Sequence, residues 1–431
     1  MKVAVIGLGY VGIPVAAALA SKNVRVVGID IDPRKVEAVS AGRSPLRGRE
    51  PGLEELIAKG VASKRLTATT DYASADASDA LIVSVETPID DATHDPEYKA
   101  LKSALRGLAP HLKRGALVSI ESTIAPGTMS GVARPTLERG SRKKAGRDFH
   151  LVHCPERVTA GKLLHNLTTL DRVIGAADER GRRKAFALYS KFVEGNLHAT
   201  DWLSAEISKT AENAYRDVQI AFANEVALIC EELGANAFRI RELVNTCPGR
   251  DMLAPGAGVG GHCIPKDSWL LVAPVVNQKP VLIPAAREIN DYMPTRMAQL
   301  VEEAMREAGR RIRGSRVAVL GFAYRENTDD ARNSPAIPLI RELRHRGADV
   351  TIHDPFARGQ RGFKVTREIR TAVKGADCVA LVTAHDAYRR LDLAKLRRWL
   401  RHRAIVDGRN AFDGSLVKRG FVYRAIGKGE F

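Results

Sequence analysis

The chain has 431 residues, a net charge of +17 and 45% hydrophobic residues. This length is too great for one ordinary core, so two or three domains are expected. No run of about 20 apolar residues occurs, which argues against a membrane span. The apolar N-terminal stretch is short and passes directly into a glycine motif, unlike a signal peptide. We therefore expect a cytoplasmic protein with no membrane partner.

The positive charge is concentrated in the C-terminal third, where residues 301–431 hold 28 Lys and Arg against 16 Asp and Glu. Such a surface could attract nucleic acid, an anionic membrane or a polyanionic small molecule. Aromatic residues make up only 5% and do not interleave with the basic ones, which disfavours nucleic acid as a partner. We attribute most of this charge to solvated arginines and expect a few of them to bind phosphate.

The five cysteines are scattered, and none has the spacing of a zinc site. An odd, scattered set argues against a disulfide framework and against a structural metal. Cys230 and Cys378 are expected to act as small buried hydrophobes. At most one cysteine needs a chemical role.

The first 200 residues alternate short apolar runs with amphipathic stretches. In chain order, strands are predicted at 2–7, 24–30, 80–85, 116–121, 150–153 and 173–175, with helices at 11–21 and 33–40. Strands that alternate with helices are typical of a parallel sheet with right-handed crossovers.

The middle of the chain is different. Residues 203–233 contain no proline or glycine, and apolar residues recur there at helical spacing. This predicts one helix about 45 Å long, ended by Gly234, that could serve as a spine between domains or as a dimer seam. Two further helices are predicted at 240–244 and 294–308.

After a basic hinge at 310–314, the alternation restarts with strands predicted at 316–321, 349–353, 378–383 and 404–407 and a helix at 335–346. A strand followed by an aspartate recurs in both halves, at Asp30 and at Asp354. We therefore predict an α/β fold of two Rossmann-like parallel-sheet domains, 1–200 and 310–431, joined by a central helical domain, 201–309, with one long helix.

Three glycines, Gly7, Gly9 and Gly12, follow the first strand and open the first helix. In a dinucleotide site they permit a tight turn, close approach of backbone to pyrophosphate, and packing of helix on strand. Asp30 ends the next strand, where a carboxylate can accept hydrogen bonds from ribose hydroxyls and repel a 2′-phosphate. This favours NAD over NADP, while Arg34 nearby keeps NADP as the alternative.

The segment 256–267 combines four glycines in its first six residues with a cysteine, a lysine and an aspartate. The glycines let backbone approach a ligand. A cation such as Lys266 near the thiol of Cys263 would favour the nucleophilic thiolate. Asp267 could act as a base or position a water. Cys263 is therefore the candidate nucleophile.

Lys209 and Asn213 lie four residues apart on the long predicted helix and therefore share one face. Their donors could stabilise an oxyanion on a carbon attacked by Cys263. They could equally form a solvated polar stripe, and the residues alone leave this open.

Together these motifs resemble those of the UDP-glucose/GDP-mannose dehydrogenase family, over nearly the whole chain. In the family's order they are GLGYVG at 7–12, EST at 121–123, PGT at 126–128, CPER at 154–157, the Lys209–Asn213 helix, GVGGHCIPKD at 258–267, NTDD at 327–330 and SP at 334–335. The resemblance implies an NAD-binding domain, a helical centre used for dimers or larger homo-oligomers, and a UDP-sugar-binding domain. It implies four-electron oxidation of the sugar C6 alcohol to a carboxylate.

The same resemblance implies roles for individual residues. Cys263 would hold the intermediate as a thiohemiacetal and then a thioester, Lys209 and Asn213 would stabilise oxyanions, and Asp267, Thr123 and Glu156 would handle water and protons. Implied cofactor contacts are Gly7, Gly9, Tyr10, Val11, Gly12, Asp30, Arg34, Thr87, Thr123 and Arg332. Implied substrate contacts are Glu156, Arg157, Lys209, Asn213, Arg250, Gly260, Tyr324, Arg325 and Arg409. Arg250 would reach the sugar-nucleotide of its own or of a neighbouring subunit.

Several segments, including 171–175, 212–218 and 286–291, are most similar to the branch of the family that acts on UDP-N-acetyl-D-mannosamine. His262 fits that branch, whereas Lys266 resembles UDP-glucose enzymes. UDP-glucose and UDP-N-acetylglucosamine stay as alternative substrates. Two competing hypotheses come from other classes. One is a two-electron hydroxyacid dehydrogenase that needs no cysteine, and the other is a basic nucleic-acid-binding or structural protein.

Overall fold

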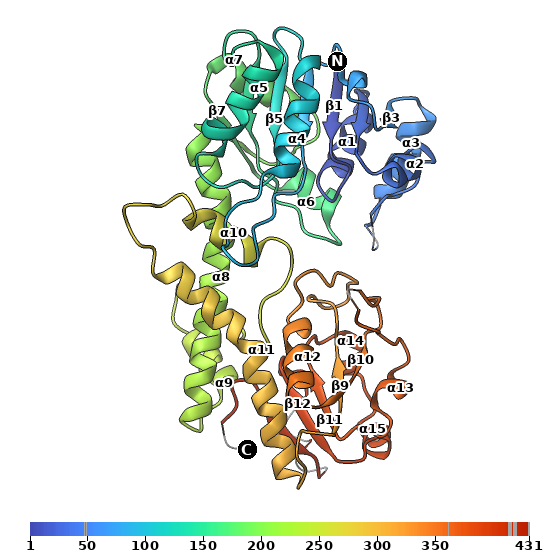
Figure 1. The fold of residues 1–431 in the computed structure, drawn as a ribbon, viewed down its shortest axis with the longest axis vertical. Coiled ribbons are helices and arrows are strands. Elements are labelled where there is room, and N and C mark those ends of the chain that lie inside the picture. The colour runs from blue at the N-terminus through green and yellow to red at the C-terminus, as the bar shows by residue number, and fades with distance from the viewer. Residues whose placement is uncertain (47, 49, 361, 413–415, 417–419, 430–431) are drawn as a thin grey trace. The chain divides into compact units, whose positions relative to one another are not determined.

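The structure is a computed structural model that describes residues 1–46, 48, 50–360, 362–412, 416 and 420–429 (Figure 1). The chain divides into two compact units, described separately below. One comprises Met1–Glu212 with Trp269–Asn277, and the other Asn213–Ser268 with Gln278–Phe431. Within the described residues, no helix is both long enough and apolar enough to cross a membrane.

The first unit is built on an eight-stranded sheet with the order β3-β2-β1-β4-β5-β6-β7-β8. Its strands are β1 (Lys2–Ile6), β2 (Arg25–Ile29), β3 (Leu66–Thr69), β4 (Ala80–Val83), β5 (Leu117–Ile120), β6 (His150–His153), β7 (Arg172–Ala176) and β8 (Leu197–Thr200). All neighbours are parallel except β6 and β7, which pair antiparallel. The first six strands have the order expected of a dinucleotide-binding fold.

Helices cover both faces of this sheet (Figure 1). They are α1 (Gly12–Ser21), α2 (Pro33–Ser40), α3 (Leu53–Ala62), α4 (Lys99–Leu108), α5 (Arg134–Ser141), α6 (Leu163–Thr169) and α7 (Glu179–Tyr189). Val3 and Val5 of β1 pack in one core with α1, α3, α6 and α7. Ala4 and Ile6 pack in a second core with α4 and α5. Because successive side chains of a strand point to opposite faces, one apolar run serves both cores.

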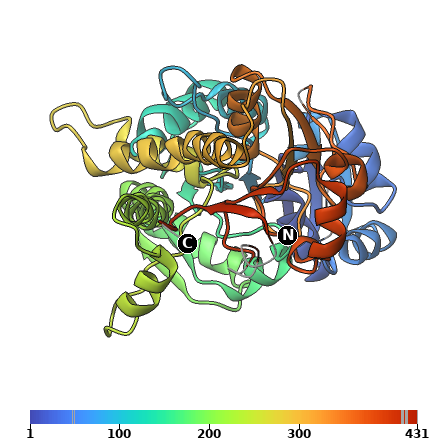
Figure 2. The same cartoon turned by 90° about the horizontal axis from the view of Figure 1, so that it is seen from below.

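The predicted long helix is α8 (Trp202–Glu232), which starts in the first unit and continues into the second. It is followed by α9 (Ala237–Val244), α10 (Ile264–Val272) and α11 (Leu282–Glu307). Figure 2 views α8 nearly end-on. The prediction that a helix begins at Pro294 is wrong, because α11 starts twelve residues earlier and holds Pro294 in its interior. Pro294 is buried there, so packing outweighs the hydrogen bond that proline cannot donate.

The second unit contains a five-stranded, fully parallel sheet with the order β10-β9-β11-β12-β13. Its strands are β9 (Arg316–Leu320), β10 (Asp349–His353), β11 (Cys378–Leu381), β12 (Ala404–Asp407) and β13 (Val422–Ala425), and its helices are α12 (Ala336–His345), α13 (Ile369–Val373), α14 (Asp386–Arg389) and α15 (Leu393–Trp399). Val317 and Val319 pack with α11 and α12, and Ala318 and Leu320 with α13 and α15. The predicted fold class is confirmed.

Candidate functional site

The turn after β1 requires glycine at two of its three glycine positions. Gly7 has a φ of +92°, and a Cβ there would lie 2.6 Å from the carbonyl oxygen of Ser84. A Cβ on Gly12 would lie 1.8 Å from the carbonyl oxygen of Gly7. A Cβ on Gly9 would meet no described atom within 4 Å. The turn is therefore closed by Gly7 and Gly12 and open over Gly9, as approach of a pyrophosphate to the backbone requires. Tyr10 and Val11 are half-buried beside it.

Asp30 follows β2 and is 6% exposed. One carboxylate oxygen accepts from the Leu8 amide (2.7 Å) and lies 3.1 Å from Lys35 Nζ, and the other accepts from the Asp32 amide (2.9 Å). A carboxylate has about four acceptor sites, so capacity is left for ribose hydroxyls. Arg34 donates twice to Asp32 at 3.0 Å, and this hydrogen bonding lowers the pKa of Asp32. The charge of Arg34 is thus already engaged.

Three predicted site residues follow neighbouring parallel strands and so lie at one edge of the sheet. Thr87, Thr123 and Glu156 come after β4, β5 and β6 and are all buried. The Thr87 hydroxyl donates to the Thr123 carbonyl at 2.5 Å. One Glu156 oxygen accepts from the Val158 amide at 2.5 Å. This edge brings together two buried threonines and a buried carboxylate.

Lys209 extends this polar cluster from α8. It is 6% exposed, and its Nζ lies 3.8 Å from Glu156 Oε1. The solvated-stripe alternative for Lys209 is therefore wrong. His153 is also buried, with Nδ1 2.9 Å from the Ile120 carbonyl. Burial, together with the charge of Lys209, lowers the pKa of His153 to about 4. The sequence reasoning missed this neutral imidazole, although it directly precedes the CPER motif.

A buried ion pair lies behind the same edge. Glu121, which follows β5, and Arg172, which opens β7, are 0% and 1% exposed and lie 2.9 Å apart. The Tyr189 hydroxyl donates to Glu121 at 2.7 Å. Burial raises the pKa of Glu121, and the charge of Arg172 opposes that rise. Such a pair needs every partner in place, since removing one leaves an uncompensated buried charge.

In the second unit, Cys263 directly precedes α10 and is partly exposed. Its carbonyl accepts from the Asp267 amide at 2.8 Å, so both side chains belong to one helical turn. Asp267 is fully buried and accepts from Asn213 Nδ2 on α8 at 2.6 Å. Lys266 Nζ lies 2.7 Å from the other Asp267 oxygen. The lysine charge is therefore paired with Asp267, and its influence on the thiol stays a prediction.

Tyr324 lies against the glycines that precede Cys263. A Cβ on Gly260 would lie 2.5 Å from the Tyr324 Cβ, and one on Gly261 3.0 Å from its ring. Burial and then the charge of Asp330 raise the pKa of Tyr324, and Cys263 is among the further contributors. The predicted substrate contacts Gly260 and Tyr324 thus lie beside the candidate nucleophile.

Arg409 reaches the same loop from the end of β12. Its Nε donates to the Val382 carbonyl (2.9 Å) and its Nη2 to the Gly258 carbonyl (3.1 Å). Burial lowers the pKa of Arg409. Within the described part of the chain, no carboxylate forms an ion pair with this guanidinium. Its surroundings suit an anion supplied by a ligand.

The remaining predicted arginines are placed differently. Arg157 donates to Glu212 (2.9 Å) and to the Asp171 carbonyl (3.0 Å), and Arg332 pairs with Asp330 at 2.6 Å. Arg250 and Arg325 are exposed. The structure therefore gives Arg157 and Arg332 internal partners and leaves the two others at the surface.

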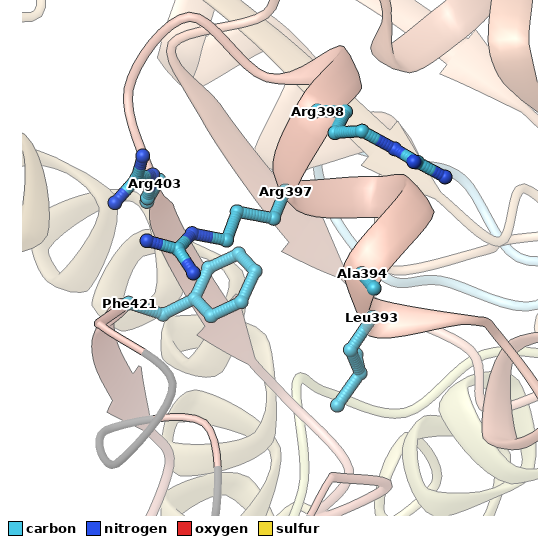
Figure 3. A pocket seen from close by; sticks show the side chains of 6 residues that line it. All are labelled: Leu393, Ala394, Arg397, Arg398, Arg403 and Phe421. Carbon is cyan, nitrogen blue, oxygen red and sulfur yellow. The ribbon is translucent and has the colours of Figure 1, made fainter.

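A surface pocket of about 660 Å³ lies at α15 and at the starts of β12 and β13 (Figure 3). It is lined by Leu393, Ala394, Arg397, Arg398, Arg403 and Phe421. These strands begin at this edge, whereas Arg409 lies where β12 ends. None of the predicted site residues lines the pocket, so it is separate from the candidate site.

Family models match three parts of the chain. The NAD binding domain of the UDP-glucose/GDP-mannose dehydrogenase family matches residues 1–193, its central domain 203–292, and its UDP binding domain 318–414.

The Cys230 and Cys378 side chains, predicted to be buried, are 5% and 0% exposed.

Known proteins resemble the chain over its full length. A UDP-N-acetyl-D-mannosamine dehydrogenase of Pyrococcus horikoshii is 37% identical, with 100% of both chains covered. The solved UDP-D-ManNAc dehydrogenase from Pyrococcus horikoshii has a TM-score of 0.94 at 36% identity, covering 100% of both chains. An NDP-N-acetyl-D-galactosaminuronic acid dehydrogenase from Methanosarcina mazei has a TM-score of 0.89 at 37% identity, covering 99% and 95%. The chain therefore belongs to the UDP-glucose/GDP-mannose dehydrogenase family and is an NAD-dependent UDP-sugar dehydrogenase.

Proposed function

We propose that the chain oxidises the C6 hydroxymethyl group of UDP-N-acetyl-D-mannosamine to a carboxylate, giving UDP-N-acetyl-D-mannosaminuronate. The observation that carries the chemistry is the link of Cys263, Asp267 and Asn213 around the start of α10. The substrate rests on the names of the similar proteins, most of which are UDP-N-acetyl-D-mannosamine dehydrogenases. UDP-glucose and UDP-N-acetylglucosamine are the alternatives.

The proposed reaction needs a residue that retains the aldehyde between two oxidations. NAD, when bound, accepts a hydride at each oxidation. The Cys263 thiolate adds to the C6 aldehyde and forms a thiohemiacetal, whose oxidation gives a thioester. Water then attacks the thioester carbonyl, the thiolate leaves, and the carboxylate is released. Asp267 takes up the proton of the attacking water, and Asn213 holds the Asp267 carboxylate in position.

Residues of the first unit are proposed for further roles in the reaction. Lys209 would stabilise the negative oxygen that develops at C6. Thr123 and Glu156 would organise the water and the proton transfers, since both are held at one sheet edge. The open turn over Gly9 and the Asp30 carboxylate would hold the pyrophosphate and ribose of NAD, with Thr87 beside them.

Arg409 would bind the UDP diphosphate, with Tyr324 and the more exposed Arg325 beside it. The guanidinium donates to two carbonyls within the described residues, and an anionic ligand would add a charge-assisted hydrogen bond. The proposed division of the chain is an NAD-binding domain at 1–200, a central helical domain at 201–309 and a UDP-sugar-binding domain at 310–431.

We also propose a homodimer formed through α8. Tyr215, Phe222 and Ile229 lie seven residues apart on that helix and are 67%, 56% and 51% exposed. Exposed apolar residues that recur every seven residues are typical of helices that pack on a partner helix. Light scattering after size exclusion should give twice the chain mass for the wild type and a monomer for Phe222→Glu.

A panel of UDP- and GDP-sugars, scored by NADH formed per sugar, tests the function. The proposal expects about two NADH per UDP-N-acetyl-D-mannosamine, since each hydride reduces one NAD. Turnover only with UDP-glucose would move the substrate to that alternative. One NADH per sugar, with full turnover by Cys263→Ser, would establish a two-electron dehydrogenase instead.

A further inference from the structure

The loop that carries Cys263 is anchored at both ends to α8. Before the cysteine, the Gly256 amide donates to Asn224 Oδ1 at 2.9 Å. After it, the Ser268 hydroxyl donates to Asp217 Oδ2 at 2.7 Å. Asp217 and Asn224 lie seven residues apart, which places them two helical turns apart on the same side of α8. One helix face therefore fixes both ends of the segment 256–268.

A second helix, α11, joins the two anchors. Asp217 Oδ1 accepts from Arg287 Nη1 and from Asn290 Nδ2, both at 2.7 Å. Asn290 Oδ1 in turn accepts from Asn224 Nδ2 at 2.8 Å. Asn290 thus connects the anchor before Cys263 to the anchor after it.

Burying these polar side chains costs desolvation free energy, which indicates a role beyond helix packing. Asp217, Asn224 and Ser268 are 0% exposed, and Arg287 and Asn290 are 1% exposed. Apolar side chains of similar volume would join two helices with less desolvation. A second contact between the same helices, Arg296 with Glu231 at 2.7 Å, does not touch the loop. Glu231 also accepts from the Gly427 amide at 2.7 Å, so this pair is a control for a buried polar bridge outside the segment 256–268.

We propose that Asp217 and Asn224 are positioning residues that fix the backbone of the segment 256–268 and thereby the Cys263 thiol. This inference rests on the proposed function, in which the thiol must meet an aldehyde that is held in one place. Within the segment, their hydrogen bonds go to the Gly256 amide and the Ser268 hydroxyl, so their effect reaches the thiol through the loop backbone. Fixed geometry matters here because misplacing a reacting group by about 1 Å can cost on the order of 100-fold in rate.

The loop has further supports that make the anchors testable one at a time. The Gly261 amide donates to the Arg332 carbonyl at 2.9 Å, and Asn333 Nδ2 donates to the Gly261 carbonyl at 3.1 Å. Removing a single anchor should therefore loosen the loop without unfolding it. Ser268→Ala removes one anchor and leaves the Arg287–Asp217 pair intact.

The test compares iodoacetamide alkylation of Cys263 with that of Cys247 by peptide mass spectrometry, from pH 6 to 9. Cys247 is exposed and serves as an internal reference, while Cys154, Cys230 and Cys378 are buried. Ser268→Ala and Asn224→Ala should each change the Cys263 to Cys247 rate ratio about tenfold or more and alter its pH profile, by analogy with the cost of misplacement. Ser268→Thr, which keeps the hydroxyl, should restore the wild-type ratio. Glu231→Gln should lower the melting temperature by a similar amount with the ratio unchanged.

A ratio that stays at the wild-type value in both anchor variants would overturn the proposal, as would an equal change in Glu231→Gln. The alkylation needs no substrate, so it separates the two hypotheses. If the wild type oxidises no UDP-sugar but the ratios change as expected, the function fails and the anchoring stands. If the wild type is active, the anchor variants should lose more activity on the C6 aldehyde than on the first oxidation. Equal losses in the two steps would count against positioning of the thiol.

Discussion

The two sheets of the molecule begin with the same turn and use it differently. Gly7 follows β1 with a φ of +92°, and Gly321 follows β9 with a φ of +93°. The Gly7 amide donates to the Ile29 carbonyl at 2.8 Å, and the Gly321 amide to the His353 carbonyl at 2.9 Å. In each sheet the glycine amide thus ties the first strand to the end of its neighbour.

An aspartate completes the turn in both sheets. The amide of Leu8 donates to Asp30 at 2.7 Å, and the amide of Phe322 donates to Asp354 at the same distance. Each carboxylate also accepts a hydrogen bond from the backbone amide two residues further along the sequence, that of Asp32 or that of Phe356. The shared pattern is an acid that clamps the turn after the first strand.

Asp30 and Asp354 differ in how many further hydrogen bonds their carboxylates can accept. Asp354 accepts further hydrogen bonds from the amides of Ala323 (2.8 Å) and Ala357 (2.7 Å), lies 3.1 Å from His385 Nε2, and is 0% exposed. Among the described residues, the further partner of Asp30 is Lys35, whose Nζ lies 3.1 Å away. Asp30 therefore keeps acceptor capacity, whereas Asp354 is occupied by its own loop, by the turn after β9 and by His385. The same turn therefore leaves acceptor capacity for a ligand in one sheet and fixes a loop in the other.

The segment after each turn explains this division. In the first unit, α1 starts at Gly12 and directs its amides at the turn, which suits a pyrophosphate. In the second unit, a loop at 322–335 intervenes before α12 and carries Tyr324, Arg325 and Arg332. The second acid braces the start of that loop, since Asp354 accepts from the amides of both Phe322 and Ala323.

The largest effect is expected at the turn after β1, where we propose that NAD binds. Gly12→Ala would place a methyl group 1.8 Å from the Gly7 carbonyl oxygen, so the turn must open. We expect NAD affinity to fall by about 100-fold or more, because the backbone no longer fits the pyrophosphate. Calorimetric titration with NAD measures this. Gly9→Ala is the matched variant, since its methyl meets open space, and it should weaken NAD binding without lowering the melting temperature. Normal NAD binding by Gly12→Ala would show that the turn is not the cofactor site.

Acid should destabilise the second turn. Burial opposes ionisation of Asp354, but the hydrogen bonds from His385 and from the backbone amides outweigh it and lower its pKa from 3.8 to about 2. A lowered pKa stabilises the fold above pH 4, and this contribution is lost as the pH falls from 4 towards 2. A shift of this size corresponds to about 2 kcal/mol of the free energy of unfolding. Urea unfolding at pH 7 and pH 3 should show the loss in the wild type, and Asp354→Asn should lack that component. An unchanged pH dependence in the variant would remove Asp354 from this account.

The proposed diphosphate site at Arg409 should affect the binding of UDP and not the binding of NAD. Arg409→Ala should weaken UDP binding by about 30-fold, or about 2 kcal/mol, because a charge-assisted contact to phosphate is lost, and it should leave NAD binding unchanged. Arg403→Ala is the control, since that arginine lies in the pocket of Figure 3 at the opposite edge of the same sheet. Equal losses in both variants would mean that net charge, not a defined site, holds the nucleotide.

The sequence predicted those features that depend on local pattern. The length of α8 was clear because the stretch lacks proline and glycine, and Cys263 and Asp267 stood out by their spacing. Strands β3 and β13 were missed because their sequences, LTAT and VYRA, lack the continuous apolar run that marks equally short strands such as β4, ALIV. The start of α11 was missed because a buried proline reads as a helix start. The roles of Asp217 and His153 were invisible because they depend on which chain segment packs against each side chain.

The smallest expected effect sharpens the comparison of the two acids. Asp30→Asn keeps the size of the side chain and removes the charge that would receive the ribose hydroxyls. We expect NAD affinity to fall about fivefold, or about 1 kcal/mol, with NADP affinity rising relative to NAD. Titration with both cofactors measures the two values, and Asp32→Asn controls for loss of a nearby charge. Because Asp354 has no remaining acceptor capacity, Asp354→Asn should change stability and leave the NAD to NADP preference as it is. An unaltered preference in Asp30→Asn would mean that the two acids do the same structural work and that cofactor choice is made elsewhere.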